Sequence, residues 1–443
     1  MQLQTLLTLA FSVTLTGCQL LSPIPNGPTP ISERLRRSRS LVAQRQAEAA
    51  SLSLYEKAHH FEQRLRKDFI VEPYGLVQQH LKPGRKEGHL ATTALFLTAL
   101  SLKYGTLKDK ADEALALRVI NGFAAMDEAN GLDGYLPDAV RLDNGRLIVS
   151  RNAAHSNAYT LLFFSFLYAY QQFDDPQLKK AIRDQISATG NYFLQHNLVL
   201  RDQTGRRVPH SNITPSPFQF SPSRCLDGLV LVESVLAILR ESRTDCDLVE
   251  EMKKQRRKMF HSGYLGKIQN LQFSFLTLMV PTHSTDWVNF VRLCTLTEAT
   301  DREDYETALH NLFRSQTHEH NPQFLIIYLS RNPDWSSRPD RFKEDIHTYL
   351  GSFPLSLNNH EIINTKDRID QKLFPPFVKD SWRAEATVPL PIYRRPLSYN
   401  EWKRNPFRLD GNFHKQGKVL YPGTDFLLAY WMGRYYQLID KDD

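Results

Sequence analysis

Cysteine is scarce in this sequence, and its scarcity excludes a disulfide-rich fold. The chain of 443 residues has four cysteines, of which Cys18 lies in an apolar N-terminal segment. The others are Cys225, Cys246 and Cys294. They are compatible with one disulfide, for which Cys225 and Cys246 are the candidate pair, or with three free thiols.

Motifs that would identify a cofactor or a nucleic acid are also missing. The sequence has no P-loop, no dinucleotide-binding fingerprint, no G-x-S-x-G motif and no metal-binding triad. We therefore expect no metal and no other cofactor. No arginine-rich arm or zinc-ligand spacing indicates nucleic acid as a partner. The net charge of +7 is spread along the chain, which predicts a solvated basic surface.

The first seventeen residues have the composition of a signal peptide. Residues 6–15 form an apolar core, and the tetrapeptide L-T-G-C that ends at Cys18 resembles a bacterial lipobox. The resemblance implies cleavage before Cys18, acylation of the protein and a cell-envelope location. Residues 18–31, which carry four prolines, are then the lipidated cysteine and a tether. Gln19 favours the outer membrane, with the body facing the periplasm or the exterior. The alternative is an ordinary signal peptide with a chance cysteine.

Residues 131–197 show the structural unit that the chain repeats. Residues 158–172 are apolar and aromatic on all sides, which predicts a buried helix. Residues 177–195 are amphipathic, which predicts a helix that covers the first one from outside. Asp175 and Pro176 suit the N-cap and the first position of this second helix. We therefore predict a helical hairpin with one inner and one outer member.

The same alternation recurs along the chain. Inner helices are predicted at residues 88–104, 158–172, 224–239, 285–297, 323–330 and 424–439. Outer helices are predicted at residues 32–68, 108–130, 177–195, 247–261, 302–316 and 338–350. Residues 197–208 have the pattern of a short β-hairpin, and residues 271–280 are ambiguous between strand and helix. Residues 351–423 form a long irregular segment, of the kind that covers a site.

Two concentric layers of helices resemble the six-hairpin, or (α/α)6, toroid of many glycoside hydrolases and polysaccharide lyases. The resemblance is carried by D-G-Y-L-P-D at residues 133–138, by the unit at residues 157–193 and by F-L-L-A-Y-W-M-G-R-Y at residues 426–435. It covers roughly residues 88–439. It implies an all-α (α/α)6 toroid with long loops and a minor β-hairpin, as one domain over residues 32–443.

In such toroids, by resemblance, the substrate binds where loops precede the inner helices. Hydrolysis of a glycosidic bond needs two carboxyl groups, one of which is held protonated by its surroundings. The catalytic candidates in these loops are Asp133, Asp138, Asp410 and Asp425. A lyase would instead need a tyrosine or histidine base, with an arginine or asparagine that neutralises a substrate carboxylate.

Seven further side chains in these loops are candidates for substrate binding. They are His89, Tyr135, Arg151, His155, Asn157, Asp227 and Arg408. Each candidate also has a structural interpretation. Asp133 and Asp138 adjoin Gly and Pro in a turn, whereas Asp227, Asp425 and His155 stand at helix starts, as does Asp286 in a further inner helix.

The sequence thus predicts a membrane-attached lipoprotein that acts on an oligo- or polysaccharide as a hydrolase or lyase. The alternative is a non-catalytic lipoprotein that binds glycan or serves as an envelope scaffold. The two differ in whether two carboxylates face each other about 5 to 10 Å apart.

Cys18→Ser tests the predicted anchor. We expect the variant to leave the membrane fraction or to accumulate as an unprocessed precursor, because the thiol that would carry the lipid is lost. Fractionation and N-terminal sequencing measure both results. Membrane association and processing that both match the native protein would contradict the lipobox interpretation.

Overall fold

The structure is a computed structural model that describes most of the chain from residue 31 onward. The described ranges are residues 31–81, 84–240, 245–271, 283–332, 339–363, 369–372, 382–386, 388–408, 410–411 and 417–443.

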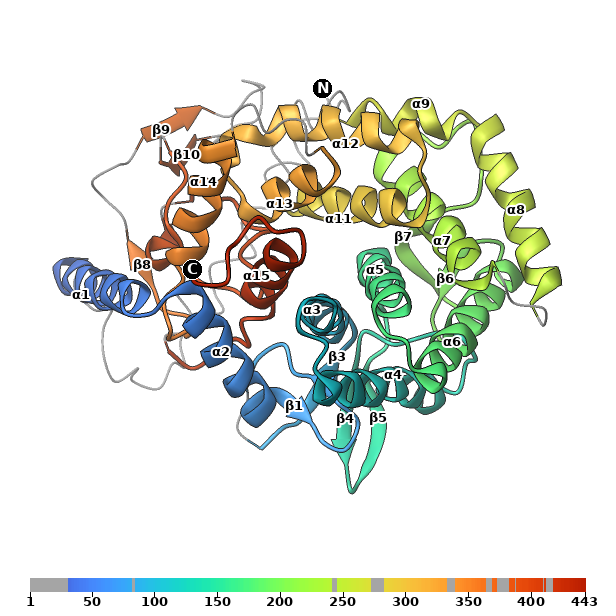
Figure 1. The fold of residues 1–443 in the computed structure, drawn as a ribbon, viewed down its shortest axis with the longest axis horizontal. Coiled ribbons are helices and arrows are strands. Elements are labelled where there is room, and N and C mark those ends of the chain that lie inside the picture. Colours follow the sequence, from blue (N-terminus) through green and yellow to red (C-terminus); the bar gives the residue numbers. More distant parts are fainter. Residues whose placement is uncertain are drawn as a thin grey trace, which may run out of the picture.

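Two layers of helices alternate along the chain and close into a ring (Figure 1). The inner helices are α3 (Leu90–Leu107), α5 (Ser156–Gln172), α7 (Pro222–Leu239), α11 (His283–Ala299), α13 (Pro322–Arg331) and α15 (Thr424–Tyr435). The outer helices are α2 (Leu54–Arg64), α4 (Lys110–Asn130), α6 (Pro176–Gln195), α8 (Cys246–His261), α12 (Glu303–Gln316) and α14 (Pro339–Gly351). Each inner helix packs against the next, and α15 packs against α3. The fold is therefore an (α/α)6 toroid, as the sequence predicts.

The inner helices are buried on nearly all sides. In α5, for example, residues 158–169 are all buried. The helix α3 is long and apolar enough to cross a membrane by length and composition, but it lies within the ring between α15 and α5. The outer helices are amphipathic, and α2, α4 and α6 begin with side-chain caps. At the start of α6, for example, Asp175 accepts a hydrogen bond from the Leu178 amide at 2.7 Å.

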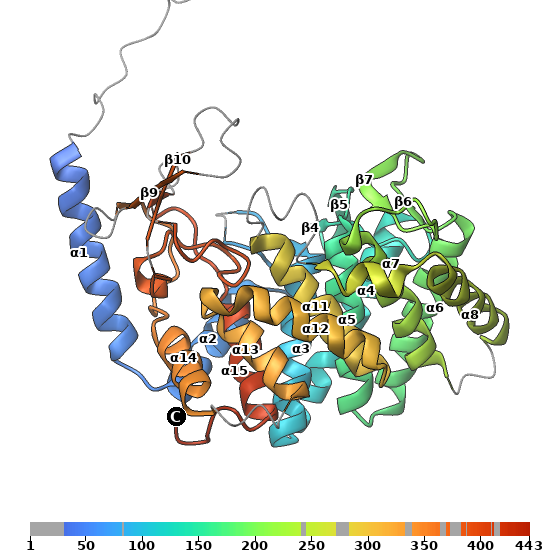
Figure 2. The same cartoon turned by 90° about the horizontal axis from the view of Figure 1, so that it is seen from above.

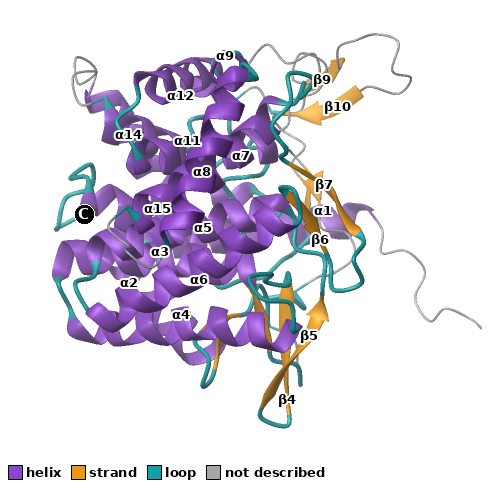
Figure 3. Cartoon of the chain, turned by 90° about the vertical axis from the view of Figure 1, so that its right-hand side faces the viewer, coloured by secondary structure: helices purple, strands orange, loops and turns teal. Residues whose placement is uncertain are grey.

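The strands gather at one end of the ring, where the inner helices begin (Figures 2 and 3). A three-stranded antiparallel sheet joins β3 (Glu87–His89), β4 (Ala139–Asp143) and β5 (Arg146–Arg151). The other two-stranded pairs are β1 (Ile70–Val71) with β2 (Leu76–Val77), β6 (Val199–Arg201) with β7 (Arg207–Asn212), β8 (Ile362–Ile363) with β11 (Asp410–Gly411), and β9 (Ile369–Lys372) with β10 (Trp382–Glu385). The hairpin predicted at residues 197–208 is confirmed as β6–β7, whereas β3, β4 and β5 were not predicted.

The predicted outer helix at residues 32–68 is wrong, because the chain breaks there into α1 (Ile31–Ala50) and α2. Ser53 accepts a hydrogen bond from the Glu56 amide, and the Glu56 carboxylate accepts one from the Ser53 amide. This reciprocal capping box begins a new helix at Leu54. As a result, α2 joins the ring beside α15, while α1 lies outside it against β8.

Three further features complete the fold. Short helices lie at Tyr264–Ile268 (α9), Thr317–Glu319 (3₁₀) and Ile392–Arg394 (3₁₀), and a π-helical turn at Leu65–Phe69 extends α2. Cys225, Cys246 and Cys294 form no disulfide with one another, so the alternative of a disulfide does not hold. Of the ambiguous segment 271–280, residues 272–280 lie outside the described residues.

Phe164→Ala tests the assignment of inner and outer layers. Phe164 is fully buried in α5, so we expect the substitution to lower the free energy of unfolding by about 3 to 5 kcal/mol. The control Lys180→Ala, in α6, removes an exposed ion pair with Asp184 and should change it by about 0.5 kcal/mol. Chemical denaturation measures both, and equally small shifts would contradict the layer assignment.

Candidate functional site

The predicted residues His89, Asp138 and Arg151 come together on the β3–β4–β5 sheet. The Asp138 carboxylate accepts a hydrogen bond from Arg151 at 2.9 Å, and half of the Arg151 side chain is exposed. His89 is buried, and burial lowers its pKa, so the ring is neutral at pH 7. Asp138 is therefore a half-buried carboxylate held by an arginine.

Two other candidates from this region have different surroundings. Tyr135 is fully buried, and its hydroxyl donates a hydrogen bond to the Asn152 carbonyl at 2.7 Å. The side chain therefore supports the loop before α5. Asp133 is exposed in the turn after α4, where Gly134 packs against the backbone of Ala188 in α6. This turn lies at the outer layer of the ring.

A buried arginine joins three inner helices on the same end of the toroid. Arg292 in α11 makes an ion pair with Asp227 in α7 at 2.6 Å and donates to Asn157 in α5 at 2.9 Å. It also donates to Asn289 at 2.8 Å, and Thr160 donates to Asp227 at 3.1 Å. Asn157 itself is exposed. The predicted residues Asp227 and Asn157 therefore belong to one polar network, which Arg292 organises.

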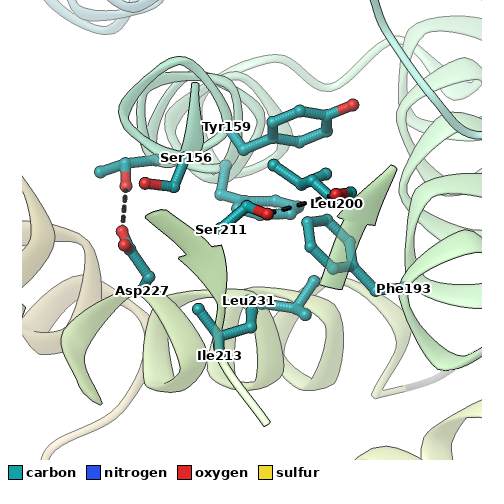
Figure 4. A pocket seen from close by; sticks show the side chains of 10 residues that line it. Ser156, Tyr159, Phe193, Leu200, Ser211, Ile213, Asp227 and Leu231 are labelled. Carbon is teal, nitrogen blue, oxygen red and sulfur yellow. Dashed lines mark hydrogen bonds between the residues drawn. The ribbon is translucent and has the colours of Figure 1, made fainter. Parts of the chain in front are cut away.

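A small pocket adjoins this network between α5, α7 and the β6–β7 hairpin (Figure 4). Thr160 and Asp227 line its polar side, and Phe193, Leu200 and Ile213 are among its apolar lining residues. Its volume is about 10 Å³, which is room for roughly one water molecule. The pocket is too small to receive a sugar ring.

A second polar group lies where α11 and α13 begin. His283 and Glu319 are both buried, and the His283 Nδ1 lies 2.6 Å from a Glu319 carboxylate oxygen. Asp286, one turn further along α11, is also buried and accepts a hydrogen bond from Gln316 at 3.3 Å. Burial and the nearby charge of Glu319 raise the pKa of Asp286 to about 7. We call His283, Asp286 and Glu319 the α11 cluster.

Unpaired polar atoms and an aromatic ring surround the α11 cluster. Within the described part of the chain, Glu319 Oε2 and Gln323 Nε2 are buried and make no hydrogen bond. The other side-chain atom of Gln323, Oε1, accepts a hydrogen bond from the Trp287 indole at 2.7 Å. The half-exposed Phe407 ring lies 6.5 Å from His283 and stacks on exposed His318 at 5.8 Å. Such a group offers hydrogen bonds and a flat apolar surface together.

A third group surrounds the predicted catalytic residue Asp425 at the start of α15. Its two carboxylate oxygens accept hydrogen bonds from the Glu401 amide at 2.7 Å and from the Phe426 amide at 2.9 Å. Burial raises the pKa of Asp425 to about 7, and the charge of Glu401 contributes in the same direction. The Trp402 indole also donates to the Asp425 carbonyl at 2.8 Å. Asp425 therefore holds the loop at residues 398–408 against α15.

The second and third groups are connected. Asn321, the N-cap residue of α13, donates a hydrogen bond to the Trp402 carbonyl at 2.8 Å. Buried Arg395 lies close enough to Glu401 and Glu319 for both carboxylates to act on its pKa. The starts of α11, α13 and α15 thus share one buried region that contains four carboxyl groups.

The remaining predicted residues are placed as follows. His155 is exposed at the N-cap position of α5, but its side chain makes no capping hydrogen bond. Arg408 is exposed beside Phe407. Asp410 lies in β11, where it pairs with Ile363 of β8, and its side chain lies outside the described part of the structure. The roles assigned to these residues stay predictions.

Sequence reasoning named Asp286 as a polar residue at the start of an inner helix, but it did not select His283 or Glu319, although a signal was present. Glu319 lies in the sequence T-H-E-H at residues 317–320, directly before the inner helix α13. The rule that substrate loops precede inner helices therefore applied to it as well. Its pairing with His283, 36 residues away, is visible only in the fold.

Two alternative kinds of site are less well supported. Among the described residues, no group of three or more His, Cys, Asp or Glu side chains is arranged to hold a metal ion. A pocket of about 250 Å³ lies at the opposite end of the ring, lined by Tyr55, Glu62, Arg66, Lys103 and Trp431 among others. Its charges are already paired, since Lys103 and Arg66 each lie 2.7 Å from Glu62.

The fold and the buried carboxyl groups define an (α/α)6 toroid with a candidate acid–base site at one end. No protein-family model matches the sequence, and no curated protein matches it. Among solved structures, the chain is similar to the GH76A α-1,6-mannanase of Salegentibacter sp. HEL1_6, with 11% identity and a TM-score of 0.44 over 87% of this chain and 100% of that one. An inactive variant of that mannanase in complex with α-1,6-mannotriose has a TM-score of 0.45 at 11% identity, with the same coverage.

The cellobiose 2-epimerase of Spirochaeta thermophila DSM 6192 is similar at 11% identity, with a TM-score of 0.43 over 93% of this chain and 100% of that one. Similarity at this level concerns the general helical architecture and not the individual residues of the site.

The raised pKa of Asp286 predicts how stability depends on pH. Between the ordinary value of 3.8 and about 7, the folded state holds a proton that the unfolded state has lost. Stability should therefore fall as pH rises through this window and level off above it. Asp286→Asn, which cannot ionise, should melt higher than the native protein at pH 8, with the difference vanishing near pH 4.

Thermal melts across this pH range measure the effect. Part of the slope should persist in the variant because Asp425 titrates in the same window. Asp174→Asn, at an exposed position before α6, is the control and should leave the pH dependence unchanged. A native slope in Asp286→Asn would contradict the raised pKa.

Proposed function

We propose that the protein is a glycoside hydrolase of the cell envelope, anchored by a lipid at Cys18, with the α11 cluster as its catalytic centre. In this proposal Asp286 is the general acid, and Glu319 is the ionised carboxylate that acts as base or nucleophile. His283 positions Glu319, and Phe407 stacks on a sugar ring.

One observation carries the proposal: two neighbouring carboxyl groups whose surroundings favour a proton on one of them. The pKa of Asp286 is raised to about 7 by burial and by the Glu319 charge. A carboxylate oxygen of Glu319 lies 2.6 Å from His283 Nδ1. Glycosidic hydrolysis needs this division of roles, because one group protonates the leaving oxygen while the other attacks or activates water.

The charges of the site favour a hydrolase over a lyase. A lyase must neutralise a carboxylate of its substrate, and the arginines at this end of the ring are the candidate cations. Arg292 is already paired with Asp227, and Arg151 is already paired with Asp138. Breaking a buried ion pair such as that of Arg292 would cost several kcal/mol.

The unpaired polar atoms support carbohydrate as the ligand. Glu319 Oε2 and Gln323 Nε2 are an acceptor and a donor that find no hydrogen bond in the described residues. A buried polar atom without a hydrogen bond costs about 1–3 kcal/mol, which sugar hydroxyls would recover.

The second candidate function, a glycan-binding lipoprotein without turnover, is favoured by the deep burial of all three cluster side chains.

The activity is tested with a panel of soluble oligo- and polysaccharides, including α-1,6-mannan because of the structural similarity. We expect the native chain to release reducing sugar from at least one of them. Asp286→Asn and Glu319→Gln should each lower kcat by about 10²- to 10⁴-fold, because general acid–base catalysis contributes about that much. Native activity should also decline as pH rises through about 7, where Asp286 loses its proton.

Asp425→Asn is the matched control, because its carboxyl has a similarly raised pKa but holds a loop. It should change thermal stability, because an amide has one oxygen in place of the two that accept backbone hydrogen bonds, and it should leave kcat nearly unchanged. If Asp425→Asn lost kcat at native stability while Asp286→Asn kept its kcat, Asp425 would be the general acid in place of Asp286. Sugar binding without turnover in the native chain would establish the binding function instead.

A further inference from the structure

Two phenylalanines are presented to solvent on the loop that leads into α7. The side chains of Phe218 and Phe220 are 78% and 81% exposed, more than any other large hydrophobic residue among those described. Gln219 lies between them. Burial of a phenylalanine side chain stabilises a folded protein by about 1.5–3 kcal/mol, and neither of these two exposed side chains makes that contribution.

The backbone of this loop is held in place by hydrogen bonds. Lys267 donates to the Pro217 carbonyl at 3.0 Å, and Tyr264 donates to the Thr214 carbonyl at 3.1 Å. Gln219 turns inward and donates to the Asn212 carbonyl at 3.3 Å. The two phenyl rings are therefore exposed on a fixed support, which lowers the entropic cost of binding a partner.

Exposed arginines occur at the same end of the molecule. Arg36, Arg37 and Arg39 are exposed in the first half of α1. Arg37 makes an ion pair with Glu33 one turn earlier, whereas Arg36 and Arg39 make no ion pair with any described residue. The start of α1 and the strands β6 and β7 lie at one end of the toroid (Figures 2 and 3). Arg206 and Arg207, at the turn of the β6–β7 hairpin that precedes the loop of Phe218 and Phe220, are exposed as well.

The position of α1 also limits how far the body can lie from an anchor. Residues 19–30, between Cys18 and α1, span at most about 40 Å when fully extended. They join the body at Ile31, and the start of α1 lies at the same end of the toroid as β6 and β7 (Figure 2). A membrane attached through Cys18 would therefore lie on that side.

We propose that the end of the toroid that carries Phe218, Phe220 and the exposed arginines of α1 docks on an anionic lipid bilayer. The phenyl rings enter the interface between headgroups and acyl chains, and Arg36 and Arg39 contact anionic headgroups. The combination of protruding apolar rings with a basic surround favours a bilayer. A sugar platform or a contact between two copies would not need the arginines of α1.

Vesicle flotation tests the docking without the lipid anchor. The chain from Gln19 to Asp443 keeps every described element, including the closed ring. It should bind vesicles of equal parts phosphatidylglycerol and phosphatidylcholine, and bind pure phosphatidylcholine more weakly. Phe218→Ser with Phe220→Ser should weaken binding to the mixed vesicles at least about 10-fold. Arg36→Gln with Arg39→Gln should weaken it about fivefold per charge, and less at high salt.

Matched controls lie at the opposite end of the ring. Tyr55 and Leu107 are about half exposed there, and Lys108 and Lys110 are exposed beside them. Tyr55→Ser with Leu107→Ser, and Lys108→Gln with Lys110→Gln, should leave vesicle binding unchanged. Equal losses in these controls, or no vesicle binding by the native chain, would overturn the proposal.

Two other outcomes would identify a different binding partner for the surface that carries Phe218 and Phe220. Loss of soluble-glycan binding in the phenylalanine variant, with vesicle binding intact, would make the patch a sugar platform and overturn the membrane proposal. If the native chain self-associated and the phenylalanine variant did not, the surface would be an interface between two copies, and the membrane proposal would again be overturned. The docking and the proposed hydrolysis fail separately, because turnover of a soluble oligosaccharide needs no bilayer.

Discussion

The structure depends on one constraint, which is that a helix apolar on all sides must be covered on all sides. Residues of α3 and α5 are buried around nearly their whole circumference, so each helix needs inner neighbours as well as an outer helix. Six such helices satisfy one another when the last, α15, packs on the first, α3. Closure of the ring then places all six helix starts at one end, and the loops that precede them converge there.

The same burial produces the chemistry of the candidate site. Asp286 and Asp425 stand at helix starts, where a carboxylate would ordinarily be stabilised by the helix dipole. Desolvation outweighs that effect in both residues and raises their pKa to about 7. Both carboxyls belong to the region where α11, α13 and α15 begin. Because ring closure places these helix starts close together, it also brings together carboxyl groups from distant segments of the chain.

The site was less predictable than the fold, and the reasons lie in particular residues. The sequence rule pointed to loops before the inner helices, and the fold places His89, Asp138 and Arg151 at one sheet and Asn157 and Asp227 in one network. It offered no means of ranking carboxylates within those loops. Glu319 depends on His283 and Asp425 depends on the Glu401 amide, and each of these contacts joins segments more than 20 residues apart.

The sequence by itself determined the type, order and approximate bounds of the helices, because periodicity and capping are local properties of the chain. It also contained the break between α1 and α2, as the S-x-x-E pattern at Ser53, although periodicity alone hid it. Only the tertiary structure decided which side chains are buried together and which carboxyl keeps its proton. Desolvation and charge coupling depend on distances through space, and sequence separation does not report those distances.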